Sequence, residues 1–183
     1  RLEYRGYDSA GIATLLNGKI DRRRSLGKIE NLKKLLKKSP IKGNVGIGHT
    51  RWATHGIPSR INAHPHSSGD VAVVHNGIIE NYDVLRKDLE RKNIIFESDT
   101  DTEVIAHLIS FFLKKNLSPL KATVTALKKV EGAFALGIIF SGINNYLICA
   151  KRGSPLAIGK GKNCNYIGSD SIALAPLTQK LCY

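Results

Sequence analysis

The pattern of apolar and polar positions over the first fifty residues predicts a hairpin, an amphipathic helix and a short strand. We expect strands over residues 10–16 and 20–26, because the Asn17-Gly18 pair between them favours a tight hairpin turn. Over residues 29–38, leucines recur at helical spacing with lysines on the opposite face. Residues 44–50 predict another strand, in which glycines alternate with apolar residues.

The rest of the chain predicts helices in the middle and strands at the end. Thr100-Asp101-Thr102-Glu103 has the pattern of a capping box, and Ser118-Pro119 is typical of a helix start. We expect a strand at 71–75, a helix at 81–92, helices that begin near Thr100 and Ser118, the latter ending at Gly132, and strands at 133–140, 146–151, 156–158 and 165–168. Strands, then helices, then strands favour an α+β fold with antiparallel sheets.

Composition narrows the class of protein. The chain has 183 residues, of which 42% are hydrophobic, and this suits one globular domain rather than a disordered tail. We expect no membrane partner, because no apolar run approaches the roughly 18 residues of a spanning helix and no signal peptide opens the chain. Since the sequence contains no Met, we interpret residues 1–183 as most of one domain, cut at both ends.

Neither the basic residues nor the cysteines by themselves indicate a specific function. The net charge of +13 comes largely from residues 22–24 and 28–38, where we expect a solvated face; a nucleic-acid surface is the weaker alternative, because no aromatic residues interleave with the cations. The three cysteines are widely spaced and form neither a disulfide framework nor a metal-binding pair. We expect buried or partly buried thiols in a reducing cytoplasm.

Polar residues are most concentrated between His49 and Asn76, which suggests a functional loop. One hypothesis is a metal site, since His64-Pro65-His66 offers two ligands, but zinc sites usually add a helical His pair, a Cys pair or a nearby carboxylate, and Asp70 is the only acid in the segment. The other hypothesis is recognition of a small anionic or zwitterionic molecule. The alternative interpretation is that Arg51 forms a surface ion pair and that Trp52 lies in the core.

In the second hypothesis each residue of the loop has a chemical role. Arg51 offers a planar fork for a carboxylate, Thr54 and His55 add donors, and Trp52 forms a wall. Asn76-Gly77 follows a predicted strand and allows two interpretations. The pair is typical of a type I′ turn, yet its side-chain amide and glycine N–H can also stabilise an oxyanion.

Several ordered motifs resemble the glucosamine-6-phosphate synthase family, specifically its N-terminal glutaminase domain. The motifs occupy residues 4–11 (YRGYDSAG), 49–56 (HTRWATHG), 62–66 (NAHPH), 74–81 (VHNGIIEN) and 98–103 (SDTDTE), and the similarity continues through 152–156 and 169–170. Other class II amidotransferases, such as the phosphoribosyl-pyrophosphate enzyme, share the Arg51 and Asn76-Gly77 themes. The residues Trp52 to His55 and the NAHPH string favour the sugar enzyme.

The resemblance implies a fold and a reaction. The fold is the four-layer αββα sandwich of the N-terminal-nucleophile (Ntn) hydrolases. The reaction is hydrolysis of glutamine to glutamate, with ammonia passed to sugar isomerase domains that convert fructose 6-phosphate to glucosamine 6-phosphate. The family nucleophile is a terminal Cys whose own α-amine is the base. Cys149, Cys164 and Cys182 do not match it, so we expect residues 1–183 to be a glutaminase domain without its nucleophile.

The resemblance also assigns roles to single residues. The glutamine carboxylate clamp falls on Arg51, the closing loop on Thr54 and His55, and the holder of the substrate's α-amino group on Asp101. The oxyanion hole falls on Asn76 and Gly77. Trp52 matches the gate to the ammonia passage, and Arg5 matches an arginine beside the nucleophile. A zwitterion needs one cationic and one anionic anchor, which Arg51 and Asp101 supply.

These assignments define the expected ligands and partners. We expect glutamine as the ligand, no cofactor, no metal and no nucleic acid, and a homodimeric, cytoplasmic full-length enzyme. The competing classes are a histidine-rich metal-binding domain and a basic nucleic-acid-binding domain.

Overall fold

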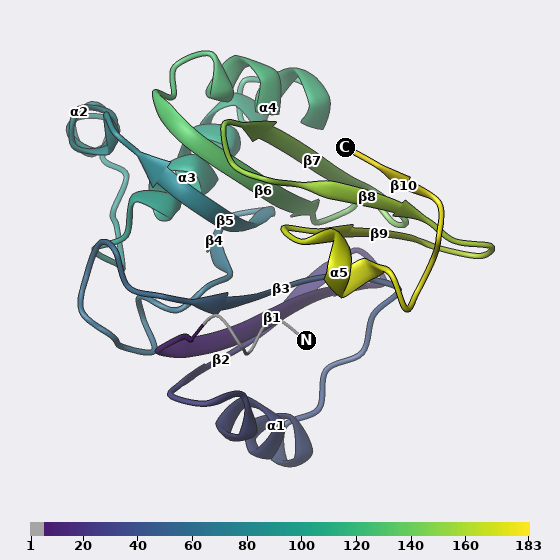
Figure 1. Cartoon of the computed structure of the whole chain (residues 1–183). Coiled ribbons are helices and arrows are strands. Elements are labelled where there is room, and N and C mark those ends of the chain that lie inside the picture. The colour runs from purple at the N-terminus through teal and green to yellow at the C-terminus, as the bar shows by residue number, and fades with distance from the viewer. Residues whose placement is uncertain (1–5) are drawn as a thin grey trace.

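Two antiparallel sheets lie face to face in the computed structural model, which describes residues 6–183 (Figure 1). One sheet has the strand order β2-β1-β3 and the other β4-β5-β6-β7. Helix α1 lies on the outside of the first sheet, and helices α2, α3 and α4 lie on the outside of the second. The predicted α+β class and four-layer αββα sandwich are therefore confirmed.

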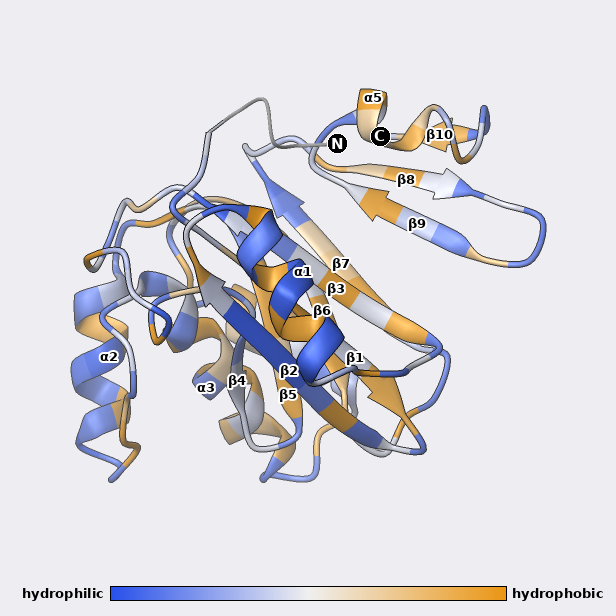
Figure 2. Cartoon of the chain, turned by 90° about the horizontal axis from the view of Figure 1, so that it is seen from below, coloured by the Kyte–Doolittle hydropathy of each residue, from blue (hydrophilic) through white to orange (hydrophobic). Residues whose placement is uncertain are grey.

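The first sheet and its helix follow the local sequence pattern closely. Strands β1 (Ser9–Leu16) and β2 (Lys19–Leu26) form the predicted hairpin, and β1 also pairs with β3 (Val45–Arg51). Asn17 and Gly18 have φ values of 51° and 76°, as a type I′ turn requires. Helix α1 spans Ile29–Lys38, as predicted, and lies over β1 and β2 with its lysines exposed (Figure 2).

The arginines of β2 do not form the solvated face that we expected. Arg22 Nη1 donates to Pro65 O at 2.9 Å, and Arg24 Nη1 donates to Ala63 O at 3.1 Å. Burial lowers the pKa of both guanidinium groups, to about 10 for Arg24. Part of the basic charge therefore ties the loop before β4 to the first sheet.

The second sheet is apolar on both faces because it is covered on both sides. Ala72 and Val74 of β5 (Val71–Ile79) pack with residues of the first sheet, whereas Val71 and Val73 pack against the helices. The neighbours of β5 are β4 (His66–Ser68) and β6 (Gly132–Phe140), and β6 pairs with β7 (Leu147–Arg152).

Asn76 and Gly77 lie inside β5, so the type I′ turn interpretation is wrong. The strand continues to Ile79, beyond the predicted end at 75, because Asn76 and Gly77 pair with Ala135 and Phe134 of β6. The loop at 51–68 also ends in a strand that we did not predict, β4. Pairing with the distant strand β6 explains the first difference, whereas β4 pairs with β5, which follows it directly in the sequence.

The helices over the second sheet are α2 (Tyr82–Glu90), α3 (Asp101–Leu113) and α4 (Pro119–Leu127). Ser118 caps α4 as predicted, with its Oγ accepting from the N–H of Lys121. Helix α4 ends before Gly132, which instead begins β6. The predicted capping box of α3 is not formed, because the Thr100 hydroxyl contacts His66 Nε2 at 3.1 Å.

A small outer sheet completes the described chain. Its order is β10-β8-β9, formed by Leu181–Cys182, Ala157–Lys160 and Asn165–Gly168, with helix α5 (Ser171–Leu174) after β9. We did not predict α5 or β10. The three thiols are unpaired; Cys149 is partly buried as expected, whereas Cys164 and Cys182 are exposed, against our expectation. No helix within residues 6–183 is long and apolar enough to cross a membrane.

Candidate functional site

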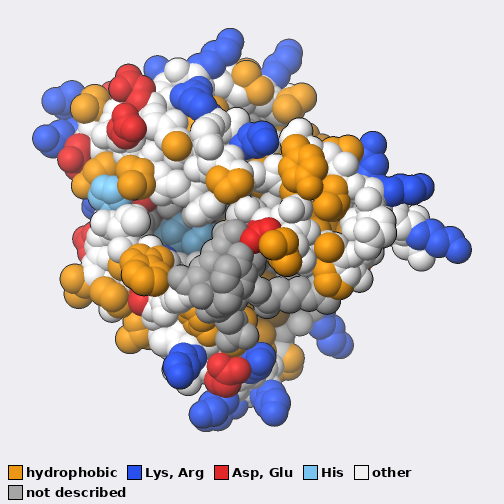
Figure 3. All heavy atoms as spheres, in the orientation of Figure 1, with side chains coloured by type: hydrophobic (Ala, Val, Ile, Leu, Met, Phe, Trp, Pro, Cys, Tyr) orange, Lys and Arg blue, Asp and Glu red, His pale blue; other side chains and the backbone are white. Residues whose placement is uncertain are grey.

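A cavity of about 360 Å³ opens between the two sheets, near the end of β9. Figure 3 shows a hollow on this face of the molecule with histidine side chains in it. Every predicted site residue in the described part of the chain lines the cavity: Arg51, Trp52, Thr54, His55, Asn76, Gly77 and Asp101. Arg5 is the remaining predicted site residue, and it lies outside the described residues. The functional roles of these residues stay predictions.

Arg51 is a buried cation at the end of β3, not half of a surface ion pair. The residue is 3% exposed, and its Nη2 donates to His55 O and, at 2.8 Å, to Gly56 O. Its Nη1 lies 3.4 Å from Asp8 Oδ1. Arg51 therefore shapes the loop that follows it, and within residues 6–183 these bonds leave its Nε–H available to a carboxylate.

Asp101 also lines the cavity, from the first turn of α3. It is 4% exposed, and its Oδ2 accepts from the backbone N–H of Ile79 at 2.9 Å. His75 Nδ1 lies 3.9 Å from the same oxygen. The bond from the Ile79 N–H therefore holds the Asp101 side chain in place at the N-terminus of α3. The cavity is thus lined by a guanidinium group and a carboxyl group.

Asn76 and Gly77 contribute to the cavity from the middle of β5. Gly77 has φ +142°, and a Cβ built on it would lie 2.1 Å from Ala133 O. No other residue fits this close approach to β6. The strand therefore fixes the Asn76 amide and the Gly77 backbone beside the cavity, where two N–H donors can meet a developing oxyanion.

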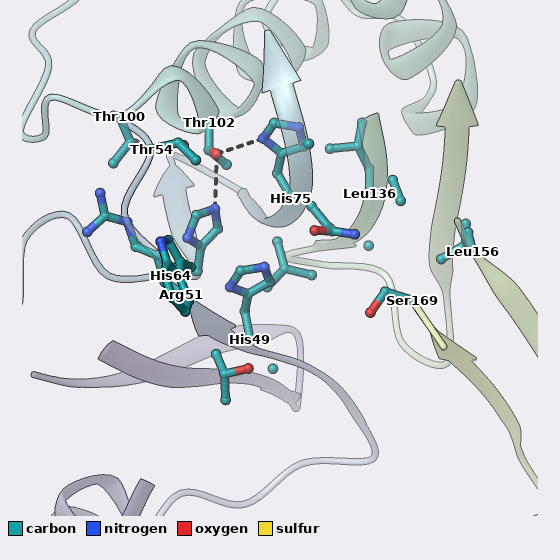
Figure 4. Close-up of a pocket in the computed structure, with 18 of the residues that line it drawn as sticks. His49, Arg51, Thr54, His64, His75, Thr100, Thr102, Leu136, Leu156 and Ser169 are labelled. Carbon is teal, nitrogen blue, oxygen red and sulfur yellow. Dashed lines mark hydrogen bonds between the residues drawn. The ribbon is translucent and has the colours of Figure 1, made fainter. Parts of the chain in front are cut away.

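Three histidines and a threonine form one side of the cavity (Figure 4), and of the histidines His64 and His75 are buried whereas His49 is partly exposed. Thr102 Oγ1 is 3.0 Å from His64 Nε2 and 2.9 Å from His75 Nδ1. Burial lowers the pKa of His49 to about 4 and also lowers those of His64 and His75. This side of the cavity is consequently uncharged at neutral pH. Of these three histidines, we had considered only His64 for a role, as a metal ligand.

His66 lies behind this wall and anchors the start of α3. Besides the contact to Thr100, its Nδ1 lies 3.5 Å from Ser98 Oγ, and burial lowers its pKa to about 3. Burial raises the pKa of Glu103, but hydrogen bonds from His107, Glu97 and Ser98 outweigh it and hold that pKa at about 2. Among the described residues, no group of three or more His, Cys, Asp or Glu side chains is placed to hold a metal ion.

The pKa values of His49 and His66 predict a loss of stability in mild acid. Both rings are neutral when folded but bind a proton below about pH 6.5 when unfolded, so stability falls as pH drops from 6.5 towards 4. At pH 5 each ring should cost about 2 kcal/mol of unfolding free energy. Urea unfolding at pH 7.5 and pH 5 measures this.

The matched variant for this measurement is His66→Gln. It removes one titrating ring, so its stability should fall less steeply over the same interval than that of the wild type. Glu103 does not contribute, because its pKa change takes effect only below about pH 4.5. Equal slopes in wild type and variant would contradict the assignment.

Trp52 and His55 lie at the outer edge of the cavity. Trp52 is 68% exposed, so the core interpretation of this residue is wrong, and its ring covers the backbone of Gly6, where a Cβ would be 2.5 Å from Trp52 Cζ3. The His55 ring packs edge-on against Tyr82, with ring centroids 4.7 Å apart. Both side chains line the cavity, and the roles predicted for them, a wall for Trp52 and a donor for His55, stay predictions.

Two residues that sequence reasoning left without a role support the loop after β3. Asp8 accepts from the Ala53 N–H and lies beside Arg51. Asn62 bonds both to the loop and to the segment before α3. Each belongs to a motif that we quoted, so the motifs were the available signal, but their contacts join segments distant in sequence.

Comparison with known proteins identifies the family. A family model described as a glutamine amidotransferase domain matches residues 49–176. The chain belongs to this family. The match covers Arg51, Asn76, Gly77 and Asp101, which lie around one cavity.

Relatives extend over the whole chain. Proteins named glutamine–fructose-6-phosphate aminotransferase (isomerizing) from Zymomonas mobilis and Mesorhizobium japonicum are 56% and 55% identical to it over 183 residues. The chain spans 30% of the length of each of these relatives. This similarity agrees with the predicted family resemblance.

Solved structures support the fold. A glutamine phosphoribosylpyrophosphate amidotransferase from B. subtilis superposes with a TM-score of 0.80 and 28% identity, over 95% of this chain and 38% of its own. A glutamine aminotransferase class-II domain protein from Silicibacter pomeroyi has a TM-score of 0.58 at 15% identity, over 84% of this chain and 75% of its own, and shows the fold alone. The class II amidotransferase fold is therefore shared.

Proposed function

We propose that these residues form the glutaminase part of an enzyme that hydrolyses glutamine and transfers the ammonia to fructose 6-phosphate, forming glucosamine 6-phosphate. The observation that carries the proposal is the convergence of Arg51, Asp101, Asn76 and Gly77 on one cavity. The identity of 56% to aminotransferases of that name supports the sugar acceptor. The phosphoribosylpyrophosphate enzyme is less similar, at 28% identity.

The substrate would be held at both charged groups of its amino acid end. Arg51 would bind the α-carboxylate through its guanidinium, and Asp101 would accept from the α-ammonium. Thr54 and His55 would close the loop over glutamine. The uncharged histidine side of the cavity suits this arrangement, because it adds no second cation to compete with Arg51 for the carboxylate.

The chemistry would then occur beside Asn76 and Gly77. A thiolate attacks the side-chain amide carbon of glutamine, and the Asn76 amide and Gly77 N–H stabilise the oxyanion of the tetrahedral intermediate. Its collapse breaks the C–N bond, with a proton going to nitrogen, and gives ammonia and a thioester. Water then hydrolyses the thioester to glutamate and the free thiol.

The thiol is proposed to be the N-terminal Cys of a segment that precedes residue 1 in the full-length protein, with its own α-amine as the base. No cysteine of the described chain lines the cavity. Arg5 is proposed to lie beside that nucleophile. Trp52 is proposed to gate the passage through which ammonia reaches the sugar isomerase domains. A cytoplasmic homodimer is the proposed full-length state.

The decisive experiment compares the complete gene product with a polypeptide of residues 1–183. The complete protein should release glutamate from glutamine and form glucosamine 6-phosphate with fructose 6-phosphate. The isolated polypeptide should release no glutamate above background, because its cavity holds the anchors and oxyanion donors but no nucleophile. Turnover by residues 1–183 would show that the nucleophile is misplaced, and each cysteine would then be substituted in turn.

Charge recognition at the two anchors predicts selective effects on glutamine binding. In the complete protein, Arg51→Lys should raise the KM for glutamine at least tenfold, because a single ammonium cannot bind the His55 and Gly56 carbonyls and the substrate carboxylate together as the guanidinium fork can. Asp101→Asn should raise it similarly, since the charge opposite the α-ammonium is lost. Steady-state glutaminase kinetics measure both.

The matched controls make the same two substitutions at an arginine and an aspartate that do not line the cavity. Arg152 also donates to a backbone carbonyl, Val130 O, and Asp88 lies on the exposed face of α2, so Arg152→Lys and Asp88→Asn should leave KM unchanged. An unaltered KM in both the Arg51 and the Asp101 variants would remove these residues from the substrate pocket.

A further inference from the structure

The loop after β3 carries Thr54 and His55, and its backbone is held at three consecutive carbonyl groups. Arg51 binds the first two, His55 O and Gly56 O. The third, Ile57 O, accepts from Asn62 Nδ2 at 3.0 Å. Asn62 therefore binds the residue that directly follows the two residues bound by Arg51.

The same Asn62 side chain reaches the segment that leads into α3. Its Oδ1 accepts from the Asp99 backbone N–H at 3.0 Å, and its Nδ2 lies 3.3 Å from Asp99 Oδ2. Asn62 is buried, with 2% of the residue exposed. Its three bonds use both N–H donors and the carbonyl oxygen of the side-chain amide. The amide cannot be flipped, because Nδ2 would then face the Asp99 N–H and Oδ1 would face Ile57 O.

The backbone of Gly56 packs closely against the side chains of Asn62 and Asp99. A Cβ built on Gly56, which has φ +76°, would lie 2.6 Å from Asn62 Nδ2 and 3.0 Å from Asp99 Cβ. Gly56 therefore lets the loop approach Asn62 and Asp99 together. A larger residue would push the loop away from α3.

We propose that Asn62 is a positioning residue that fixes the glutamine-binding loop relative to Asp101. Asp101 is two residues beyond Asp99, so the Asn62 amide joins the loop of the carboxylate anchor to the helix of the ammonium anchor. The inference rests on the proposed glutaminase function and adds a residue that sets the separation of its two anchors. The proposed role of Asn62 concerns substrate binding. Among the described residues its hydrogen bonds go to Ser59, Ile57 and Asp99, and not to the proposed oxyanion donors.

Loss of this link should raise KM and spare kcat. Glutamine must meet both anchors at once, so freedom between them costs binding energy, whereas the oxyanion donors are fixed independently by β5. In the complete protein, Asn62→Ala should raise the KM for glutamine roughly tenfold, with kcat within about twofold of wild type.

The second pair of variants tests the link without creating a cavity. Asn62→Asp removes both Nδ2 donors and places a carboxylate against Asp99 Oδ2, so its KM should rise at least as much as that of Asn62→Ala. The double variant Asn62→Asp/Asp99→Asn exchanges the two groups and restores a donor–acceptor pair between them. It should recover part of the lost affinity, short of wild type because the bond to Ile57 O is still missing.

Ser59→Ala is the matched control. Ser59 Oγ accepts from the Asn62 backbone N–H at 3.1 Å, in the same segment, but touches neither anchor. Its KM should stay near the wild-type value. A wild-type KM in Asn62→Asp, no recovery in the double variant, or parallel losses of kcat and thermal stability would each overturn the proposal. Absence of glutaminase activity in the wild-type complete protein would instead reject the proposed function.

Discussion

Asn76→Ala is expected to lower the glutaminase kcat of the complete protein by roughly a hundredfold or more, with a much smaller change in KM. Loss of one oxyanion donor from a preorganised site usually has this size. The donor matters in the transition state, where charge develops on the amide oxygen, and little in the ground state. Steady-state kinetics with glutamine, followed by glutamate release, separate the two constants.

Two further variants distinguish the oxyanion role from a packing role. Asn76→Asp keeps the shape but replaces the N–H donors with a negative charge, so its kcat should fall at least as far. Asn165→Ala alters an exposed asparagine in β9 and should have no effect. Nearly full turnover in Asn76→Asp or Asn76→Gly would show that Asn76 does not stabilise the intermediate.

The elements that could be predicted well from sequence are those decided by nearby residues. The β1–β2 hairpin depends on the two left-handed residues Asn17 and Gly18, and α1 depends on leucines spaced along ten residues. Helix α4 begins where a serine precedes a proline. In each case the stabilising contacts lie within a few positions, so the pattern contains the information.

The elements that could not be predicted depend on distant partners. Asn76-Gly77 has the local preference of a turn, yet nine consecutive residues of β5 pair with β6, some sixty positions later. Thr100 and Glu103 have the spacing of a capping box, yet buried His66 and the Ser98 N–H bind them instead. Tertiary contacts therefore overrode local propensity at the places where the cavity is built.

The candidate site shows the same division. Residue types and motifs pointed to Arg51, Asp101 and Asn76-Gly77, and the structure brings these to one cavity. Sequence alone did not show that Asp8 holds the loop or that Asn62 joins it to the segment before α3, since Ala53 and Asp99 lie 45 and 37 positions from them. Spacing can indicate which chemistry is available, but the residues that position it become visible only in the fold.

Gly77→Ala is expected to lower stability by about 3 kcal/mol or more and to abolish glutaminase activity. The new Cβ would lie 2.1 Å from Ala133 O and 2.8 Å from Ala133 C, and backbone atoms of a paired strand cannot rotate away as a side chain can. For a domain of this size the melting temperature should fall by roughly 10 °C. Calorimetry of the complete protein measures the loss.

Gly48→Ala is the control for this substitution. Gly48 also lies in a strand beside the cavity, but its Cβ would be 3.5 Å from Gly11 O, an ordinary contact, so stability should stay near the wild-type value. The contrast separates a close backbone approach from the general effect of adding a methyl group to a strand. A Gly77→Ala protein with wild-type stability would mean that β5 and β6 can separate at this point. The Gly77 N–H would then not be held rigidly enough to serve as a preorganised oxyanion donor.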